Sequence, residues 1–344
     1  MSSPTPSSDK TPLVNRESDA FLDKALRPSS WDEYIGQKNI KDNLKILLQA
    51  AKNRHHPPEH LLFYGPPGLG KTTLAYLIAK ELGGQIKSTS GPAIEKVGDL
   101  ASIITNLEPG DILFIDEIHR LNKLIEEVLY PAMEQGSLNI IIGKGPGARV
   151  IQLELPPFTL IAATTRIALL SSPLRSRFSG GTHRLEFYTN TEIGEIISRS
   201  AKILDIKIEP EAVTLISSRS RSTPRTANHL LKRARDYADV HNLPLNADTV
   251  GKALDLLGID KLGLTISDRA VLEVLANKFK GGPTGLSTIA TALSEEEATV
   301  EEVYEPYLIQ CGFIERTPRG RILTDSGYEH LGLVAPVDKQ HRLI

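Results

Sequence analysis

Residues 65–72, which read GPPGLGKT, restrict the fold of this chain more than any other stretch. They fit the pattern G-x-x-x-x-G-K-[ST], in which a glycine-rich turn joins a strand to a helix. Residues 61–64 before the turn have the apolar character of a buried strand, and residues 73–80 after it have that of a helix. The backbone N–H groups of such a turn and the N-terminus of the helix attract an anion. The pattern therefore predicts a phosphate-binding loop.

Two side chains of this loop have expected roles at a nucleotide. Lys71 would reach the β- and γ-phosphates of ATP, and the hydroxyl of Thr72 would bind Mg²⁺. The alternative is a glycine-rich turn that matches the pattern by chance. The strand before the turn and the helix after it disfavour that alternative.

Composition limits the size and the class of the protein. A chain of 344 residues with 40% apolar and 24% charged residues is typical of a globular protein of about two or three domains. The formal net charge of −2 argues against general coating of nucleic acid, although it allows a local basic patch.

Cysteine content and hydropathy predict a cytoplasmic protein without a membrane segment. Cys311 is the single cysteine, so no intramolecular disulfide can form and a reducing compartment is expected. The N-terminus lacks the apolar core of a signal peptide, and no stretch reaches the ~18 apolar residues of a membrane span. Residues 1–15 are rich in Ser, Pro and Thr, and we expect them to form a disordered tail.

The first large unit, residues 16–188, has the pattern of a parallel α/β sheet. Residues 112–115 and 158–164 are continuous apolar runs, as in strands buried on both faces. Their alternation with helices predicts a doubly wound α/β domain. Residues 138–155 interrupt it with a β-hairpin around the sequence GKGPG. That hairpin is either a partner surface or an element packed on its own domain, and the pattern does not decide between them.

The rest of the chain predicts two smaller domains. Residues 189–260 form an all-helical domain, with helices expected at 191–204, 211–219, 225–241 and 247–257. Residues 261–344 form a winged helix-turn-helix. Its expected elements are a helix containing residues 272–279, a helix at 286–293, a helix opened by a capping box at 299–302, and a hairpin of residues 312–316 and 320–323.

Acidic and hydroxyl residues follow the buried strands. A carboxylate at the carboxyl end of a parallel strand beside a phosphate-binding loop can hold Mg²⁺, which is the role we expect for Asp116. Glu117 is then placed to polarise the attacking water. Thr164 ends the third strand, where its hydroxyl either bonds the water or γ-phosphate or is an ordinary strand-end threonine.

Arginines form the third group of candidates. Arg175 and Arg177 follow the third strand two residues apart, where a guanidinium supplied across a subunit boundary would stabilise charge on the transferring phosphoryl group, and its planar fork suits that task better than lysine. Arg225 opens a helix of the second domain and is expected to contact the γ-phosphate. In the hairpin of the winged helix, a loop bent by Gly and Pro carries Arg316, Arg319 and Arg321, which suit the DNA phosphate backbone, with recognition by shape rather than by base sequence. The alternative for the arginines after the third strand and for those of the hairpin is a solvated surface charge.

These residues resemble the AAA+ ATPases, and within them the RuvB family of bacterial Holliday junction branch-migration motors. The resemblance covers residues 20–332. Its matching stretches are Gly65–Thr73, Leu113–Leu121, Val128–Glu134, Leu155–Arg166, Ser172–Phe178, Arg184–Tyr188 and Glu305–Arg321. The last stretch lies outside the ATPase core and separates this family from other AAA+ proteins.

The resemblance implies an ATP- and Mg²⁺-dependent enzyme, a homohexameric ring that pumps double-stranded DNA during branch migration of Holliday junctions in recombination and repair. It implies Arg177 as the arginine finger, Thr164 as sensor 1, Arg225 as sensor 2, and DNA contacts from Arg316 and Arg321. The hairpin 138–155 would bind RuvA, and the resolvase RuvC is a further candidate partner. The implied nucleotide-lining residues are Leu26, Arg27, Gly65, Gly68, Gly70, Lys71, Thr72, Thr73, Glu134, Gln135, Gly136, Arg177, Tyr188 and Arg225.

The sequence departs from the family pattern in three places. Residues 179–182 read SGGT and are one residue longer than the usual Phe-Gly-Ile segment, which leaves the path after the finger open. Ala162 replaces a usual glycine, and Glu297 stands where relatives often carry a DNA-contacting arginine.

Two other functions remain open from the sequence. One is an AAA+ protein remodeller or clamp-loader-like switch whose winged helix binds protein. The other is a small-molecule P-loop kinase, which the finger arginine and the helical domain disfavour.

Overall fold

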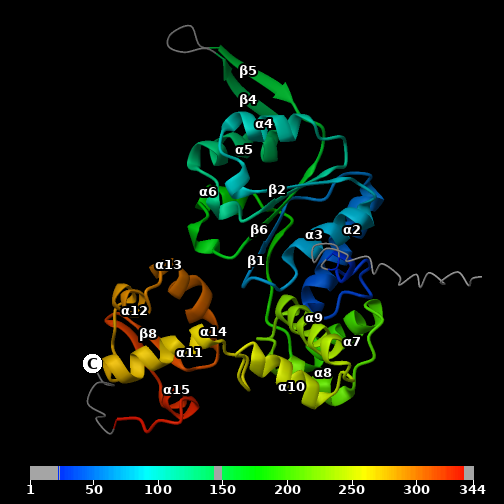
Figure 1. Cartoon of the computed structure of the whole chain (residues 1–344). Helices are drawn as coiled ribbons and strands as arrows, with labels where there is room; N and C mark the ends of the chain where they lie inside the picture. Colours follow the sequence, from blue (N-terminus) through cyan, green and yellow to red (C-terminus); the bar gives the residue numbers. More distant parts are fainter. Residues whose placement is uncertain (1–21, 23, 143–148, 337–344) are drawn as a thin grey trace, which may run out of the picture.

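The structure is a computed structural model of the chain and describes residues 22, 24–142 and 149–336. The described residues fall into three parts, visible in Figure 1. An α/β part carries a projecting hairpin, a helical part follows it, and a small winged-helix part ends the chain.

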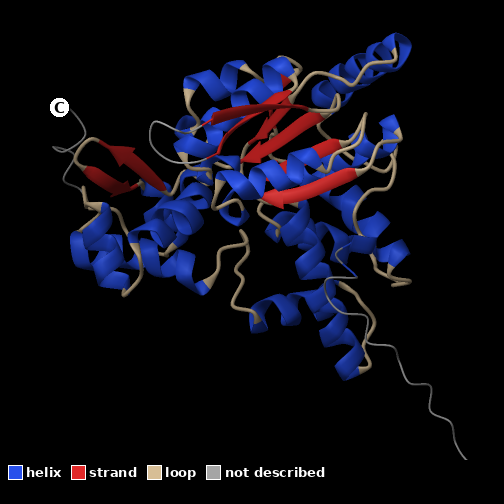
Figure 2. Cartoon of the chain, turned by 90° about the horizontal axis from the view of Figure 1, so that it is seen from above, coloured by secondary structure: helices blue, strands red, loops and turns tan. Residues whose placement is uncertain are grey.

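The central sheet confirms the expected parallel α/β architecture. Within the described residues, five strands lie in the order β2-β3-β6-β1-β7, and every neighbouring pair is parallel. Helices cover both faces of this sheet (Figure 2). The strands are β1 (Leu61–Tyr64), β2 (Ile86–Ser90), β3 (Ile112–Asp116), β6 (Thr159–Thr164) and β7 (Gly181–Arg184).

The three central strands were expected from their apolar runs, whereas the two edge strands were not. β2 reads IKSTS and is half-exposed, so it lacks the continuous apolar run of a buried strand. β7 begins within the segment whose path the sequence left open. There Gly180 donates its N–H to the carbonyl of His60 at 3.0 Å. A Cβ on Gly180 would lie 2.6 Å from the carbonyl oxygen of Glu59, so a glycine is needed for this close approach.

Alternate residues along the strands point to opposite faces and build two cores. Phe63 and Phe114 pack with α2 and α3 on one face, and Leu62 and Leu113 pack with α4 and α5 on the other. The helices of this part are α2 (Lys38–Arg54), α3 (Lys71–Leu82), α4 (Val97–Thr105), α5 (Lys123–Gln135) and α6 (Ser172–Ser176), with the short turns η1 (Gly91–Ala93), η2 (Ile118–Arg120) and η4 (Ile167–Leu169).

The hairpin predicted at residues 138–155 consists of β4 (Ser137–Ile142) and β5 (Arg149–Glu154), which pair antiparallel and project from the α/β part (Figure 1). Residues 143–148 of its predicted tip lie outside the described residues. Leu138 at its base is fully buried, whereas Ile151 is exposed. The base of the hairpin is therefore packed on its own domain.

The helical part shares a core with one face of the sheet. Ile193, Leu230 and Leu231 belong to the same hydrophobic cluster as Phe63. The predicted helices are confirmed to within one or two residues. They are α7 (Asn190–Ile203), α8 (Pro210–Arg219), α9 (Pro224–His241) and α10 (Ala247–Leu256).

The winged-helix part has its own core, centred on residues such as Leu272, Ile289 and Leu308. Its elements are α11 (Ile266–Glu273), η5 (Val274–Lys278), α12 (Leu286–Leu293), α13 (Glu297–Thr299), η6 (Val300–Tyr304), α14 (Glu305–Gln310), β8 (Ile314–Thr317), β9 (Gly320–Leu323) and α15 (Asp325–His330).

One predicted boundary in this part is wrong. The third helix begins at Glu297, so Thr299 lies inside it and caps nothing. The capping-box pattern at residues 299–302 arose because Ser/Thr-x-x-Glu also occurs by chance on a polar helix face. The following turns, Val300–Tyr304, are a π-helix, a form often found at functional positions.

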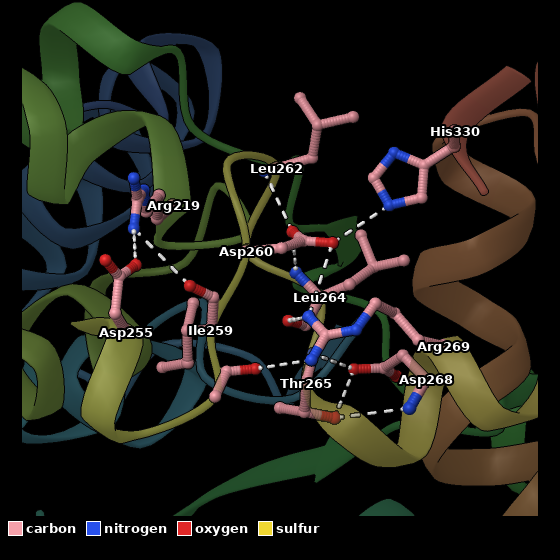
Figure 3. Close-up of polar contacts among 12 residues, drawn as sticks. Arg219, Asp255, Ile259, Asp260, Leu262, Leu264, Thr265, Asp268, Arg269 and His330 are labelled. Atoms are coloured by element: carbon pink, nitrogen blue, oxygen red, sulfur yellow. Dashed lines mark hydrogen bonds and ion pairs between the residues drawn. The ribbon is translucent and has the colours of Figure 1, made fainter. Parts of the chain in front are cut away.

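The joint between the helical and winged-helix parts is rich in polar contacts, as Figure 3 shows. The carboxylate of Asp260 accepts the backbone N–H groups of Leu262 and Leu264, each at 2.9 Å, and lies 2.9 Å from Nε2 of His330. The fully buried Asp268 pairs with Arg221 of the helical part. These contacts fix the short connection between the two parts.

None of the helices in the described part of the chain combines the length and the apolar character needed to cross a membrane.

Candidate nucleotide-binding site

A cavity lies between the α/β part and the helical part, at the carboxyl ends of β1 and β3. Eleven residues predicted from the sequence line it, namely Leu26, Arg27, Gly68, Gly70, Lys71, Thr72, Thr73, Asp116, Glu117, Tyr188 and Arg225. The carboxyl end of a parallel sheet is where open α/β folds bind ligands. The sequence motifs and the cavity therefore coincide.

The phosphate-binding loop depends on its glycines. Gly68 and Gly70 have φ values of 80° and 100°, a region that residues with a side chain rarely adopt. Gly65 does not line the cavity. A Cβ at that position would lie 2.7 Å from the carbonyl oxygen of Leu185. Glycine is therefore needed at position 65 because the backbone of Leu185 packs against it.

The amino group of Lys71 lies on the inner side of this loop. Its Nζ donates to the carbonyl oxygens of Gly65 and Pro66, each at 2.8 Å. Burial lowers the pKa of Lys71 to about 8, although the carboxylates of Asp116 and Glu117 act in the opposite direction. A phosphate would give this buried cation a stronger partner than the carbonyls do.

The predicted metal ligands lie next to each other. Oγ1 of Thr72 is 3.4 Å from Oδ2 of Asp116, and the N–H of Glu117 donates to Oδ1 of Asp116 at 3.0 Å. Hydroxyl and carboxylate oxygens suit Mg²⁺, which takes its other ligands from water and nucleotide phosphates.

The structure places Thr164 outside the cavity, contrary to the expectation for sensor 1. Thr164 is fully buried, with its hydroxyl 2.9 Å from Nδ1 of His119. The next residue, Thr165, lines the cavity, and its hydroxyl lies 3.4 Å from Oε2 of Glu117. The expected hydroxyl therefore belongs to Thr165, one position after the predicted Thr164. Side chains alternate between opposite sides of a strand, so a shift of one residue reverses the direction of the hydroxyl.

The helical part closes the cavity through the start of α9. The N–H of Arg225 lies 3.4 Å from the carbonyl oxygen of Gly68, and its side chain lines the cavity. Tyr188 donates its hydroxyl to the carbonyl of Leu69 at 3.2 Å. A movement of the helical part would therefore displace groups that are hydrogen-bonded to the phosphate-binding loop.

Several lining residues carry no motif and were not expected. Tyr34 is almost fully buried beside Gly70, and Arg199 of α7 donates to the carbonyl of Leu26 at 2.9 Å and pairs with Glu33. In the sequence, Arg199 is one of several charges on an amphipathic helix. Only the folded chain shows that it holds the segment before α2 over the cavity. The other lining residues that were not expected are Pro28, Ile35, Ile196, Pro224 and Asn228, together with Pro67 of the phosphate-binding loop.

Four residues expected to line the nucleotide lie elsewhere on this chain, namely Glu134, Gln135, Gly136 and Arg177. Arg177 pairs with Glu134 at 3.0 Å, and its guanidinium lies 4.3 Å from the centre of the Tyr130 ring. The four residues form a separate edge of the α/β part. None of them lines the cavity of its own chain.

The two arginines expected to touch DNA surround one buried carboxylate. Glu305 is fully buried, and its Oε2 accepts from Nε of Arg316 at 2.8 Å and from a terminal nitrogen of Arg321 at 3.2 Å. The side chain of Arg316 remains 47% exposed, whereas that of Arg321 is 15% exposed. Arg316 is thus available to a phosphate, and Arg321 mainly neutralises Glu305.

The parallel sheet, the phosphate-binding loop, the acidic pair after β3 and the helical lid define a P-loop ATPase of the AAA+ class. Comparison with known proteins specifies it further: the chain belongs to the RuvB family. Three family models match in sequence order, the Holliday junction DNA helicase RuvB P-loop domain over residues 26–185, the RuvB AAA lid domain over 188–260 and the RuvB C-terminal winged helix domain over 261–332.

Individual relatives are similar along nearly the whole chain. The Holliday junction branch migration complex subunit RuvB of Chloroflexus aggregans is 54% identical over 328 residues, which are 94% of this chain and 93% of that protein. The solved structure of the Thermotoga maritima RuvB Holliday junction branch migration motor is 50% identical, covers 91% of this chain and 100% of its own, and has a TM-score of 0.82. A single-substitution variant of that motor covers 90% and 99%, with a TM-score of 0.83.

Proposed function

We propose that this chain is an ATP-driven motor that moves the branch point of Holliday junctions along double-stranded DNA. The observation that carries the proposal is one cavity, built by the P-loop, Asp116, Glu117 and the lid, in a chain that also ends in a winged helix. The relatives named for branch migration match all three parts of the chain, which supports the same function here.

The chemistry proposed for the cavity is hydrolysis of ATP with Mg²⁺. Mg²⁺ would neutralise charge on the phosphates, held there by Thr72 and Asp116. Lys71 binds the β- and γ-phosphates, and Glu117 orients and polarises the attacking water. We assign the sensor hydroxyl to Thr165, because it faces the cavity and lies beside Glu117.

The edge that carries Arg177 supports a ring. In that arrangement Arg177, Glu134, Gln135 and Gly136 face the ATP of the neighbouring subunit, and Arg225 reports hydrolysis to the lid. A homohexamer is the proposed assembly, with residues 16–188 as ATPase domain, 189–260 as lid and 261–344 as DNA-binding domain. The projecting β4–β5 hairpin is the proposed contact for RuvA, and the protein acts in the cytoplasm on junctions that RuvC could later resolve.

The decisive experiment is branch migration of a synthetic four-way DNA junction with ATP, with and without a RuvA partner. Glu117→Gln is the matched control, because it keeps the size and the hydrogen-bonding reach of the side chain and removes the charge that polarises water. We expect the wild type to process the junction and the variant to bind ATP without processing it.

The opposite result has a clear meaning. ATP hydrolysis without any effect on the junction, even with the partner present, would contradict the DNA motor and favour a protein-remodelling ATPase.

A further inference from the structure

An ion pair joins the winged-helix part to the α/β part beside the candidate active site. Arg166 follows β6 by two residues, and its guanidinium pairs with the carboxylate of Glu302 in η6. In the sequence, 135 positions separate the two residues, so no local pattern indicates this contact. The pair places a residue of the DNA-binding part next to the end of β6, where Thr164 is the last strand residue and Thr165 follows it.

On the ATPase side, close polar contacts connect Arg166 to Glu117 through Thr164 and His119. The N–H of Arg166 donates to Oγ1 of Thr164 at 2.9 Å. The same oxygen lies 2.9 Å from Nδ1 of His119, and that nitrogen lies 3.2 Å from Oε2 of Glu117. Thr164 and His119, which have no role in the proposed hydrolysis, thus form the connection between Arg166 and Glu117.

On the DNA side, the same short segment carries the partners of the wing arginine. Glu301 and Glu305 flank Glu302 in the chain, and both pair with Arg316. A DNA phosphate that binds Arg316 competes with Glu301 and Glu305 for it. Contact with DNA at the wing therefore acts on the segment from which Glu302 reaches Arg166.

We propose that the Arg166–Glu302 pair restrains the carboxylate of Glu117 through Thr164 and His119, and that DNA bound at the wing releases it by displacing Glu302. Arg166 and Glu302 are positioning residues, since neither lines the cavity. The inference rests on the proposed function only in taking Glu117 as the residue that polarises water and the wing as the DNA contact.

The ring of His119 provides the two-state element that such a restraint needs. Its Nδ1 faces both the hydroxyl of Thr164 and the carboxylate of Glu117, and one nitrogen cannot accept the proton of Thr164 while donating a proton to Glu117. Burial lowers the pKa of His119, which favours the neutral ring with a single N–H. When Nδ1 carries the proton, it lies with the hydroxyl of Thr165 against Oε2 of Glu117, and both contacts weaken that oxygen as an acceptor of a proton from water.

The pair is half-exposed, with side-chain exposures of 35% for Arg166 and 45% for Glu302. Pairs of this kind add little to overall stability. A weak pair is suited to a restraint that DNA must be able to break. Couplings between distant sites typically change an equilibrium by about 5- to 150-fold, which sets the size of the effect to look for.

The test measures ATP turnover of the full chain with and without a four-way DNA junction. Glu302→Gln should raise the DNA-free kcat about fivefold or more and reduce the stimulation by DNA by the same factor, while KM for ATP stays within about twofold. The double variant Arg166→Glu/Glu302→Arg should restore the stimulation, because it rebuilds the pair with reversed charges.

A matched control separates this effect from the loss of any surface carboxylate. Glu81→Gln breaks the Lys52–Glu81 pair, whose exposures of 40% and 39% are similar, and it should behave as the wild type. The inference is overturned if Glu302→Gln keeps the wild-type DNA-free rate, or if the reversed pair fails to restore stimulation although it folds. A wild type that hydrolyses ATP but ignores DNA contradicts the proposed function instead. The DNA-free rate of Glu302→Gln then still tests the restraint.

Discussion

Thr164 and Thr165 show how one position decides the role of a side chain. Both carry the hydroxyl that a nucleotide sensor needs; Thr164 is the last residue of β6 and Thr165 is the first residue after it. Thr164 points into the protein toward His119, whereas Thr165 points into the cavity toward Glu117. Substitution of either threonine by valine keeps the shape of the side chain and removes its hydroxyl, so the two variants directly compare the roles of the two hydroxyl groups.

Thr165→Val should lower ATP turnover by about 10²-fold, because it removes a hydrogen-bonding group from the reacting centre. Thr164→Val should not lower turnover, because its hydroxyl lies outside the cavity and belongs to the proposed restraint on Glu117. It should lower the thermal unfolding temperature, since it leaves the N–H of Arg166 without its acceptor at a cost of about 1–3 kcal/mol. The checks are steady-state ATP hydrolysis and thermal unfolding of both variants. A larger loss of turnover in Thr164→Val would return the sensor role to that residue.

At the scale of an element, the wing is a β-hairpin folded around a buried acid. Arg316 and Arg321 are directly opposite each other in the β8–β9 register, and both reach Glu305 at the start of α14. Burying the carboxylate of Glu305 without a positive partner would be costly, so the two arginines stabilise the hairpin. They differ in exposure, since the side chain of Arg316 is much more exposed than that of Arg321. The sequence of the hairpin could not show which arginine contacts DNA and which stabilises the fold, because their partner Glu305 lies in α14.

The two arginines should therefore respond differently to substitution by alanine. Arg316→Ala should weaken DNA binding and reduce the slope of log affinity against log salt by about 0.9. Arg321→Ala should destabilise the winged-helix part by up to about 3 kcal/mol, because Glu305 loses a partner in a buried site. Salt titrations of DNA affinity and thermal unfolding distinguish the effects. Equal losses of affinity with unchanged stability would show that both arginines serve DNA alone.

At the scale of the whole molecule, the proposed ring completes each candidate active site with a second subunit. Arg177 lies on an edge apart from its own cavity, where Glu134 and the ring of Tyr130 hold it. Glu134 is half-exposed, so the loss of Arg177 leaves no buried charge behind. The fold of the subunit should then tolerate the substitution, while the shared site should not.

Arg177→Ala should keep nucleotide binding and lose about 10³-fold or more in turnover, the usual effect of removing an arginine finger. Mixing it with Lys71→Ala should recover part of the activity, because one variant supplies an intact cavity and the other an intact finger. ATP hydrolysis of each variant alone and of the mixture is the measurement. Without recovery in verified mixed assemblies, Arg177 does not act across the boundary.

Features that depend on neighbours in the chain were predictable from the sequence. The phosphate-binding loop, the strands β1, β3 and β6 and the helices α7 to α10 follow from contiguous patterns, because glycine positions, apolar runs and helical periodicity act over a few residues. The same local logic placed Lys71, Thr72, Asp116 and Glu117 at one cavity. It failed at Thr299, where a pattern of four residues matched a helix start that the fold does not use.

Tertiary structure alone decided the features that join distant residues. The polar edge strands β2 and β7 form because β3 and β1 offer them backbone N–H and C=O groups for pairing. Neither edge strand has an apolar run from which it could be predicted. The direction of Thr165, the burial of Glu305 under two arginines and the pairing of Arg166 with Glu302 depend on elements far apart in the chain. A contact between such elements is set by how whole layers pack, and packing is a property of the folded molecule rather than of any short stretch. The sequence by itself determined which chemistry this chain carries, and the fold decided which side chains are in position to perform and control it.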